Sequence, residues 1–187
     1  MARLPPLTEP LCDTRACLRD AAERDIPEIL IAHEDDRSLH LRLFRDRPPS
    51  GAELGRLAES AYADRVAGSR ATLTLVVPGN DVCVGQLQVH DLDWEHARGE
   101  LSIWVAPGSR RRGLATAALG LAGDWLLEDC RLARVQILVE LDNQAMLTAA
   151  ARAGFRDEGV LRAHLRRRSG RCDVRVLSLL PADREPA

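Results

Sequence analysis

Apolar residues recur every three or four positions in several stretches of the chain, which is the spacing of one buried helix face. In the stretch 51–68 the apolar face ends at Val66, and Ser50 with Glu53 forms a capping-box pattern at its start. The four ranges in which this spacing predicts helices are 20–36, 51–68, 114–128 and 143–153.

Other stretches are short and either alternate apolar with polar positions or are rich in β-branched residues, which is typical of strands. The turn signal at 78–80 separates two of them and predicts a hairpin. The strands expected at 99–105 and 134–140 enclose one helix, a connection long enough for parallel pairing. The ranges in which we expect strands are 14–18, 71–77, 82–90, 99–105, 134–140 and 174–180.

The composition is that of an ordinary globular protein. The 187 residues are 45% hydrophobic and 29% charged, so the chain can bury a sizeable core. We expect one domain over 14–181, a leader at 1–13 in which prolines block regular structure, and a polar tail at 182–187. Disorder and coiled coil are excluded as the main class, and a net charge of −2 argues against nucleic acid as a partner.

Two residue types narrow the chemistry. The chain has no lysine, so all 26 basic side chains are arginine, as codon usage in a GC-rich genome would produce. Schiff-base chemistry and a P-loop lysine are therefore excluded. The five cysteines contain no C-x-x-C pair, so we expect no metal site and reduced thiols in the cytoplasm. We expect neither a secretory signal nor a membrane span.

One loop has the features of a phosphate-binding site. The residues at 105–116 join a predicted strand to a helix, whose first amides lack partners within the helix and lie at the positive end of its dipole. Arg110, Arg111 and Arg112 add charge, and Gly113 lets the backbone approach a ligand closely. The Walker and dinucleotide patterns are both absent. The loop therefore indicates a pyrophosphate site or, alternatively, a solvated basic turn.

The motifs from this loop onward resemble those of the GCN5-related N-acetyltransferases (GNAT). R-R-R-G-L-A at 110–115 fits the family motif R/Q-x-x-G-x-G/A, and NQAMLTAAARAGF at 143–155 is similar to the family segment N-x-x-(S/A)…A-x-x-A-G-F. The resemblance covers 14–181 and implies an α/β fold, a mixed and mostly antiparallel sheet with splayed central strands and flanking helices. The stretches that resemble the end of the RimJ/RimL branch are 159–162, 171–173 and 177–180.

The resemblance also implies a site for acetyl-CoA as co-substrate, in a cleft between the strands at 99–105 and 134–140. Splayed strands leave N–H and C=O groups unpaired, and an amide-bearing pantetheine arm can satisfy them. Asn143 would contact the pantetheine or thioester end, cap the following helix, or do both. The residues expected to bind the cofactor are Ile103, Trp104, Val105, Arg110, Arg111, Arg112, Gly113, Leu114, Ala115, Thr116 and Asn143.

Acetyl transfer to an amine needs a base, and Glu100 is the candidate catalytic residue, because the family often has a glutamate at this place. Burial in a partly apolar cleft raises the pKa of a carboxyl group toward the working pH. The alternative role for Glu100 is an outward-facing polar residue or an inter-strand salt bridge. Glu140, Asp91 and Asp93 are weaker candidates.

The chain departs from the family pattern at the position of the proton donor for the leaving thiolate. Close relatives have serine where this chain has Met146, and a thioether cannot donate a proton. Tyr62 is the only tyrosine and lies far upstream. Ser102, Cys172 or water remain as donors, or the thiolate leaves unassisted.

The sequence gives little information about which amine the protein prefers as acceptor. The segments 35–50 and 51–68 would frame the acceptor entrance. Three groups of residues could act at the acceptor or cofactor site, or could simply pack or face solvent. They are Glu34, Asp35 and Asp36, then His90, Trp94 and His96, and the basic segment 162–171, which is a candidate hairpin.

The sequence therefore predicts a cytoplasmic N-acetyltransferase that moves an acetyl group from acetyl-CoA to a primary amine, either a protein N-terminal α-amine or a small molecule. Two alternatives stay open. One is a catalytically weak or inactive CoA-binding or interaction module, and the other is a transferase of another acyl group such as succinyl. The expected partners are acetyl-CoA and the amine, and a homodimer stays open.

Overall fold

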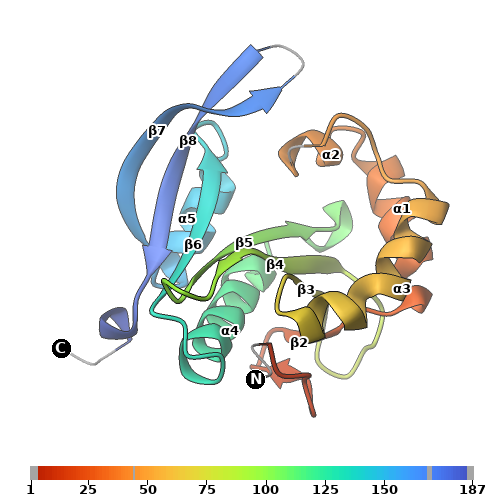
Figure 1. The fold of residues 1–187 in the computed structure, drawn as a ribbon. Helices are drawn as coiled ribbons and strands as arrows, with labels where there is room; N and C mark the ends of the chain where they lie inside the picture. The colour runs from red at the N-terminus through yellow and green to blue at the C-terminus, as the bar shows by residue number, and fades with distance from the viewer. Residues whose placement is uncertain (1–3, 44, 168–169, 185–187) are drawn as a thin grey trace.

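An eight-stranded sheet with helices on both faces forms the framework of the computed structural model, which describes residues 4–43, 45–167 and 170–184 (Figure 1). The strand order is β1-β2-β3-β4-β5-β6-β8-β7. All neighbouring strands are antiparallel except β5 and β6, which run parallel because a helix connects them. The strands are β1 (Leu11–Cys12), β2 (Cys17–Asp20), β3 (Ala71–Val76), β4 (Gly85–Asp93), β5 (Arg98–Val105), β6 (Arg134–Glu140), β7 (Arg156–Arg167) and β8 (Gly170–Leu179).

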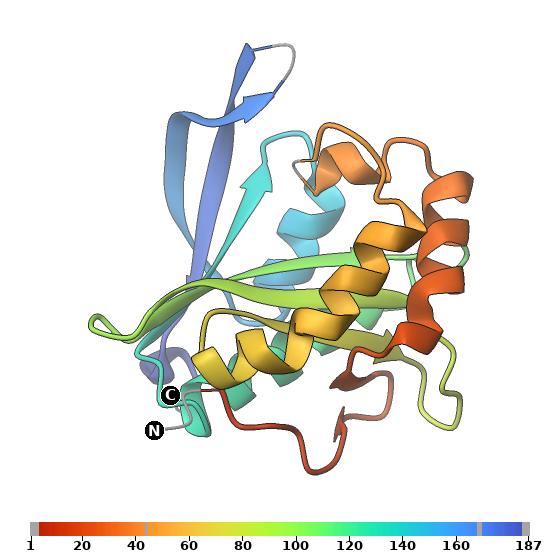
Figure 2. The ribbon, with the colours of Figure 1, turned by 45° about the vertical axis from the view of Figure 1, so that its right-hand side comes forward.

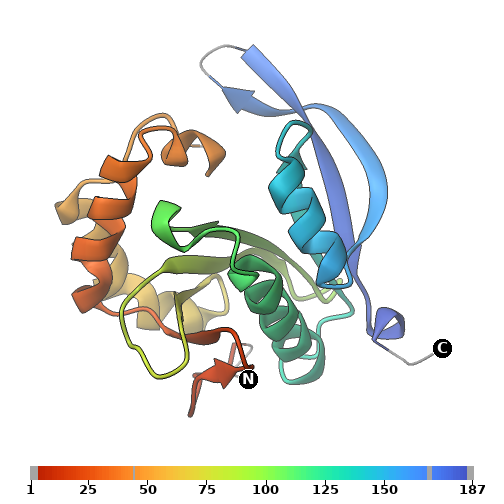
Figure 3. The ribbon, with the colours of Figure 1, turned by 180° about the vertical axis from the view of Figure 1, so that it is seen from behind.

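Helices α4 and α5 cover one face of the sheet, and α1 and α3 pack on the other (Figures 2 and 3). α4 inserts fully buried Leu119, Ala122 and Leu126 into the main core against the strands. Ile29, Leu54 and Trp104 form a second cluster on the opposite side of the sheet. The helices are α1 (Ile26–Asp35), α2 (Leu39–Arg42), α3 (Gly51–Ala67), α4 (Leu114–Glu128) and α5 (Gln144–Arg152), with 3-10 turns at Glu23–Asp25, Pro107–Ser109 and Pro181–Asp183.

The predicted fold class is confirmed, and the central elements form close to their expected bounds. α4 and β6 match the predicted ranges 114–128 and 134–140, and α3 begins directly after Ser50. The Ser50 Oγ accepts a hydrogen bond from the Glu53 amide at 3.3 Å, and a Glu53 carboxylate oxygen accepts one from the Ser50 amide at 2.8 Å. The capping box read from the sequence is therefore present.

The predicted apolar face of α3 is wrong at one position. Val66 is 60% exposed, and its neighbour Arg65 is buried instead. Arg65 pairs with Asp20 and donates two hydrogen bonds to the Pro5 carbonyl oxygen, at 3.1 and 2.6 Å. Burial of this guanidinium is tolerated because the partners satisfy its donors.

The chain start is more ordered than the prolines predicted. Leu11–Cys12 pair with Cys17–Leu18 as an edge ladder, and Leu4 is only 1% exposed in the main core. A disulfide joins Cys12 and Cys17, which corrects the expectation that all thiols are reduced. No recognised spacing motif marks this pair, because the proximity of the two sulfurs depends on the turn between β1 and β2.

Three further differences concern elements with weak sequence patterns. The helix expected from residue 20 starts at Ile26, after a 3-10 turn. Helix α2 was not expected, and β7 was expected only from residue 162 onward, as one side of the candidate hairpin. β7 is almost wholly exposed at the sheet edge and has two register shifts, so it shows no regular apolar alternation. None of the helices described here is long and apolar enough to cross a membrane.

Candidate active site

A cleft opens where the two parallel strands separate. β5 and β6 are paired only from Arg98 with Arg134 to Leu101 with Ile137, although both strands continue beyond that point. The edge of β5 that faces β6 therefore has no strand partner over 102–105 in the described chain. A cavity of about 920 Å³ fills the space between these ends and the N-termini of α4 and α5. The splayed strands expected at 99–105 and 134–140 are thus observed.

The N-terminus of α4 faces this cavity without a side-chain cap. Gly113 precedes the helix with φ of +79°, a left-handed conformation that favours glycine. The first helical hydrogen bond is donated by Ala117 to the Gly113 carbonyl oxygen at 3.0 Å, so the preceding first-turn amides have no partner within the helix. The expected cofactor-binding residues that line the cavity are Ile103, Trp104, Val105, Arg110, Arg111, Gly113, Leu114, Ala115, Thr116 and Asn143, whereas Arg112 does not line it.

Arg110 is already engaged by groups of this chain. Its Nη2 donates to a carboxylate oxygen of Asp36 at 2.7 Å, and its Nε donates to the Val105 carbonyl oxygen at 3.0 Å. Hydrogen bonds from Ser38 and Arg110 lower the pKa of Asp36 to about 2, so the carboxylate is ionised at neutral pH. The predicted phosphate ligand Arg110 thus spans the cleft between the phosphate loop and the segment that follows α1.

Asn143 caps α5 at the same cavity. Its side-chain oxygen accepts a hydrogen bond from the Met146 amide at 3.3 Å, which is the N-cap role that the sequence left open. Met146 also lines the cavity and packs against the main core. The residue that replaces the family serine is therefore at the cleft, with a thioether that has no proton to donate.

A second cavity of about 610 Å³ lies between the sheet and helices α1 and α3. Glu100 lines this cavity and not the first one. The four residues that line both cavities are Leu43, Ser102, Trp104 and Leu138, so the two cavities are neighbours.

Glu100 is half-buried. Burial raises the pKa of its carboxyl group above the usual value, and a hydrogen bond that Gln136 donates at 3.0 Å opposes this rise. Glu100 lies opposite His90 on β4 and opposite Gln136 on β6. A carboxyl group with a raised pKa beside a cavity is suited to accept and release a proton.

His90 and Asp91 join Glu100 in this second cavity. His90 Nδ1 lies 2.8 Å from an Asp91 carboxylate oxygen. One potential ligand atom from each of the three residues lies within 4.8 Å of the others, so the cluster has the donor types of a cation site. The same three groups can also relay a proton away from Glu100.

His33 is a cavity residue that the sequence identified only as part of a helix face. It is 6% exposed, lines the second cavity, and its Nδ1 has no hydrogen-bond partner within the described residues. Burial, with nearby His40 and Arg45, lowers the pKa of its imidazole. A neutral, unpartnered imidazole nitrogen can bind a polar group of a ligand. No sequence pattern distinguishes it from a histidine that only packs.

Other candidates from the sequence lie elsewhere or have partners. Asp93 bonds His96 and Arg98, and Trp94 donates to the Gly68 carbonyl oxygen at 2.7 Å. Neither Cys172 nor Tyr62, which is 75% exposed, lines either cavity, whereas Ser102 lines both. Glu140 lines the first cavity but pairs with Arg42 and Arg167.

The basic segment 162–171 lies in β7 and β8, except for residues 168–169, which lie outside the described residues. Arg167 pairs with Glu140, and Arg171 donates to the Ala163 carbonyl oxygen at 2.7 Å. Part of this segment therefore stabilises the β7–β8 pair and the end of β6.

Comparison with known proteins shows which family this chain matches. Residues 15–156 match the family model described as "Acetyltransferase (GNAT) domain". A stretch of 97 residues is 27% identical to the uncharacterized N-acetyltransferase YoaA of Bacillus subtilis. This match covers 52% of the chain and 55% of YoaA, so the chain spans about half the length of that curated relative.

Solved structures with the same fold extend over nearly the whole chain. RimJ of Mycobacterium smegmatis, in complex with CoA-disulfide, is 21% identical with a TM-score of 0.82, covering 96% of this chain and 89% of that one. The spermidine N-acetyltransferase of Vibrio cholerae, in complex with CoA and spermine, is 19% identical with a TM-score of 0.79, covering 91% and 98%. At these identities the likeness establishes the shared fold.

Proposed function

The chain belongs to the GNAT acetyltransferase family, and we propose that it transfers an acetyl group from acetyl-CoA to a primary amine. The observation on which this proposal rests is that two cavities lie next to each other and share Ser102 and Trp104 as lining residues. One cavity contains an uncapped helix N-terminus and an unpaired strand edge, and the other contains Glu100. A group donor and an acceptor can therefore approach each other from two sides of β5.

The first cavity fits acetyl-CoA in its chemistry. Free amides of the first turn of α4 and the arginines of the preceding loop suit a diphosphate, because fixed charge and helix dipole have the same sign there. The unpaired edge of β5 near Ile103–Val105 offers the pantetheine arm backbone partners. When bound, acetyl-CoA supplies the acetyl group as a reactive thioester. Asn143 holds the end of α5 beside that group.

Glu100 is the residue that we assign as the base. The amine must lose a proton to become a nucleophile, and a carboxylate whose pKa is raised by burial accepts that proton more readily at neutral pH. His90 and Asp91 pass the proton on to solvent. Ser102 lines both cavities, and its hydroxyl is the donor that we assign to the leaving thiolate in place of Met146.

The second cavity suits a polar acceptor that carries an amine. Glu100 and Asp91 supply negative charge on one part of its lining, Arg45 and Arg70 supply positive charge on another, and the unpartnered Nδ1 of His33 can accept a hydrogen bond. The neighbour from Vibrio cholerae binds spermine. A protein N-terminus or a small amine both satisfy this chemistry. The cytoplasmic location expected from the sequence remains part of this proposal.

A CoA-binding protein without catalysis is the second candidate, because Met146 stands where the family has a serine. One experiment separates the two. The protein is incubated with acetyl-CoA and a panel of N-terminal peptides, polyamines and simple amines, and both thiol release and acetylated product are followed. Reactions without acceptor correct for the free cysteines of the protein. Turnover with any amine supports the enzyme, CoA binding without turnover supports the binding protein, and absence of CoA binding contradicts both.

A further inference from the structure

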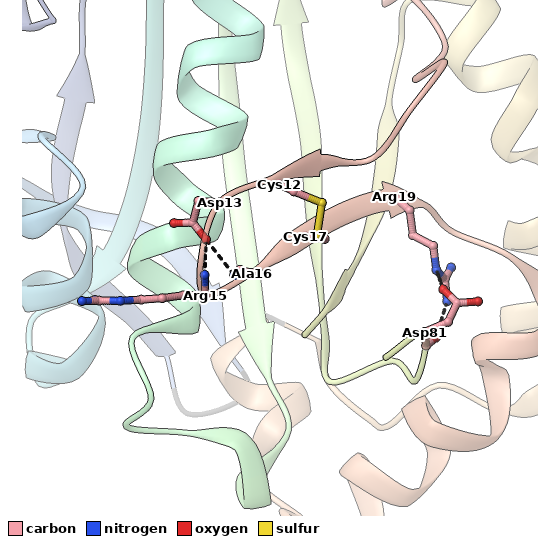
Figure 4. The surroundings of a disulfide bond; sticks show 7 residues. All are labelled: Cys12, Asp13, Arg15, Ala16, Cys17, Arg19 and Asp81. Atoms are coloured by element: carbon pink, nitrogen blue, oxygen red, sulfur yellow. Dashed lines mark hydrogen bonds and ion pairs between the residues drawn. A yellow bond between two sulfur atoms is a disulfide. The ribbon is translucent and has the colours of Figure 1, made fainter. Parts of the chain in front are cut away.

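The turn between β1 and β2 is held by several interactions and lies beside the phosphate loop (Figure 4). The disulfide joins Cys12 and Cys17, which are also strand partners. Within the turn, one Asp13 carboxylate oxygen accepts hydrogen bonds from the amides of Arg15 and Ala16, both at 2.7 Å. Because the turn is closed at its base and bonded inside, Arg15 extends from a fixed backbone.

The Arg15 side chain reaches the residue that precedes α4. A Cβ atom built on Gly113 would lie 3.2 Å from Arg15 Nη1 and 3.7 Å from Arg15 Cδ. The guanidinium is therefore beside the N-terminus of α4, although Arg15 lies about a hundred residues earlier in the chain. Arg15 is exposed, and among the described residues no carboxylate forms an ion pair with it.

The arginines of the phosphate loop do not by themselves neutralise all the phosphate charge of coenzyme A. Arg110 is paired with Asp36, and Arg112, like Arg15, lies outside the lining of the first cavity. Coenzyme A carries a diphosphate and a 3′-phosphate, so its charge exceeds what Arg111 and Arg152, the cavity's other arginines besides the paired Arg42, can neutralise. A guanidinium beside free helix amides is well suited to a phosphate, since it adds charge-assisted hydrogen bonds to the same group.

We propose that Arg15 is a phosphate-binding residue of the acetyl-CoA site, and that the Cys12–Cys17 disulfide positions it. This inference rests on the proposed function, because it assumes that the first cavity binds a CoA ester. Neither the phosphate-loop motif nor the helix N-terminus includes Arg15. Its role is created by the turn that brings a distant segment to Gly113.

The disulfide makes this contribution sensitive to redox state. A dithiol reductant converts Cys12 and Cys17 to two thiols and is itself oxidised to a disulfide, so that two electrons and two protons pass to the protein. Cys12 is exposed and within reach of such a reagent. Reduction removes the covalent closure of the turn, and the loop must then lose more conformational entropy to hold Arg15 at the phosphate.

The test measures CoA dissociation constants for four samples, the wild type and Arg15→Ala, each oxidised and each reduced with a dithiol. Mass spectrometry after thiol alkylation verifies that reduction adds two reactive thiols. We expect Arg15→Ala to weaken CoA binding by the oxidised protein about two- to fivefold, the size of one solvent-exposed charge pair. Reduction weakens wild-type binding to a similar extent and leaves Arg15→Ala unchanged.

Arg56→Ala is the matched control, because Arg56 is an exposed arginine on α3, away from both cavities. If Arg15→Ala binds CoA like Arg56→Ala, Arg15 is not a phosphate-binding residue and the inference fails. The proposed role of the disulfide is wrong if reduction weakens CoA binding by Arg15→Ala as much as it weakens CoA binding by the wild type. Failure of the wild type to bind CoA would instead overturn the proposed function, and this inference with it, so the two failures are distinguishable.

Discussion

The chemistry assigned to Glu100 depends on what surrounds one carboxyl group. The sequence indicated a glutamate on the strand that enters the phosphate loop. The structure adds Gln136 as a hydrogen-bond donor, His90 and Asp91 as neighbours, and enough burial to raise the pKa of Glu100. Asp93, only a few residues away along the chain, has its pKa lowered instead, by a hydrogen bond from the His96 amide. Environment therefore distinguishes residues that the sequence ranked only by position.

Glu100→Gln should reduce kcat/KM about 10²- to 10⁴-fold, the usual contribution of a general base. In the wild type, activity should rise with pH through the raised pKa of Glu100, because only the carboxylate accepts a proton. The variant should lack this limb of the pH–rate profile. Steady-state kinetics across the pH range provides the measurement, and a variant with an unchanged profile would exclude Glu100 as the base.

The same substitution should not destabilise the protein at neutral pH. A raised folded-state pKa means that the stability contribution of Glu100 is fully present below its unfolded pKa and is lost as pH rises through the folded pKa. Gln keeps a neutral group at this position. Thermal unfolding at pH 7 should therefore give a Tm no lower than that of the wild type, which separates catalytic loss from unfolding.

At the scale of elements, two helix N-termini frame the first cavity and are built differently. α5 has a side-chain cap from Asn143, whereas α4 starts after Gly113 with none. A capped helix end is stabilised internally, while an uncapped one leaves its amides for a ligand. This contrast supports the proposed phosphate binding at α4, and it leaves two proposed roles for Asn143, helix capping and cofactor contact.

Asn143→Ala should lower the free energy of unfolding by about 1 kcal/mol, because the α5 cap is lost. It should also raise KM for acetyl-CoA if the carboxamide contacts the cofactor. Asn143→Ser is the matched variant, because a serine hydroxyl can cap the helix but is too short to replace the carboxamide. Urea unfolding and acetyl-CoA kinetics of both variants provide the test. Normal KM in Asn143→Ser would restrict Asn143 to capping.

The pairing of β4 with β5 also depends on a small residue. A Cβ atom on Gly85 would lie 2.3 Å from the Trp104 carbonyl oxygen, so backbone atoms of the strand that borders both cavities would have to move. Gly85→Ala should lower stability and impair CoA binding. Gly55→Ala on α3 meets no atom within 4 Å and should raise stability by up to about 1 kcal/mol. Chemical denaturation compares the two, and a Gly85→Ala protein as stable as the wild type would contradict this close contact.

At the scale of the whole molecule, ion pairs bridge the first cavity between distant segments. Asp36, after α1, holds Arg110 of the phosphate loop, and Arg42 on α2 holds Glu140 and Asp142 at the end of β6. These contacts join the N-terminal helices to both sides of the cavity. Binding of a CoA ester at Arg110 must therefore compete with a carboxylate of the same chain.

Asp36→Asn should strengthen CoA binding about two- to fivefold, because it releases Arg110 from an exposed ion pair. The pKa of Asp36 is about 2, so the pair persists at neutral pH, and its stabilising effect is lost only as pH falls from the unfolded pKa through about 2. Asp35→Asn is the control for charge alone, because Asp35 is exposed and does not line the cavity. Calorimetric CoA titration compares the variants, and equal affinities would contradict the competition.

Elements with strong local signals were predicted well from the sequence. The Ser50 capping box, the α4 pattern and the buried strand β6 depend on neighbours within a few residues, so local physics determines them. The first half of β7, the short α2 and the burial of Arg65 were missed. β7 forms because β8 offers it a ladder, and Arg65 is buried because Pro5 and Asp20 satisfy its guanidinium.

The sequence by itself determined the family and the α/β fold class, and it supplied the phosphate loop and Glu100 as candidates, because short motifs and periodic patterns are local properties of the chain. Only the tertiary structure decided that Glu100 lines a second cavity that shares Ser102 with the first, that Asp36 holds Arg110, and that a disulfide-closed turn brings Arg15 to Gly113. Each of these depends on distances between residues far apart in the chain, which packing sets and no local pattern records.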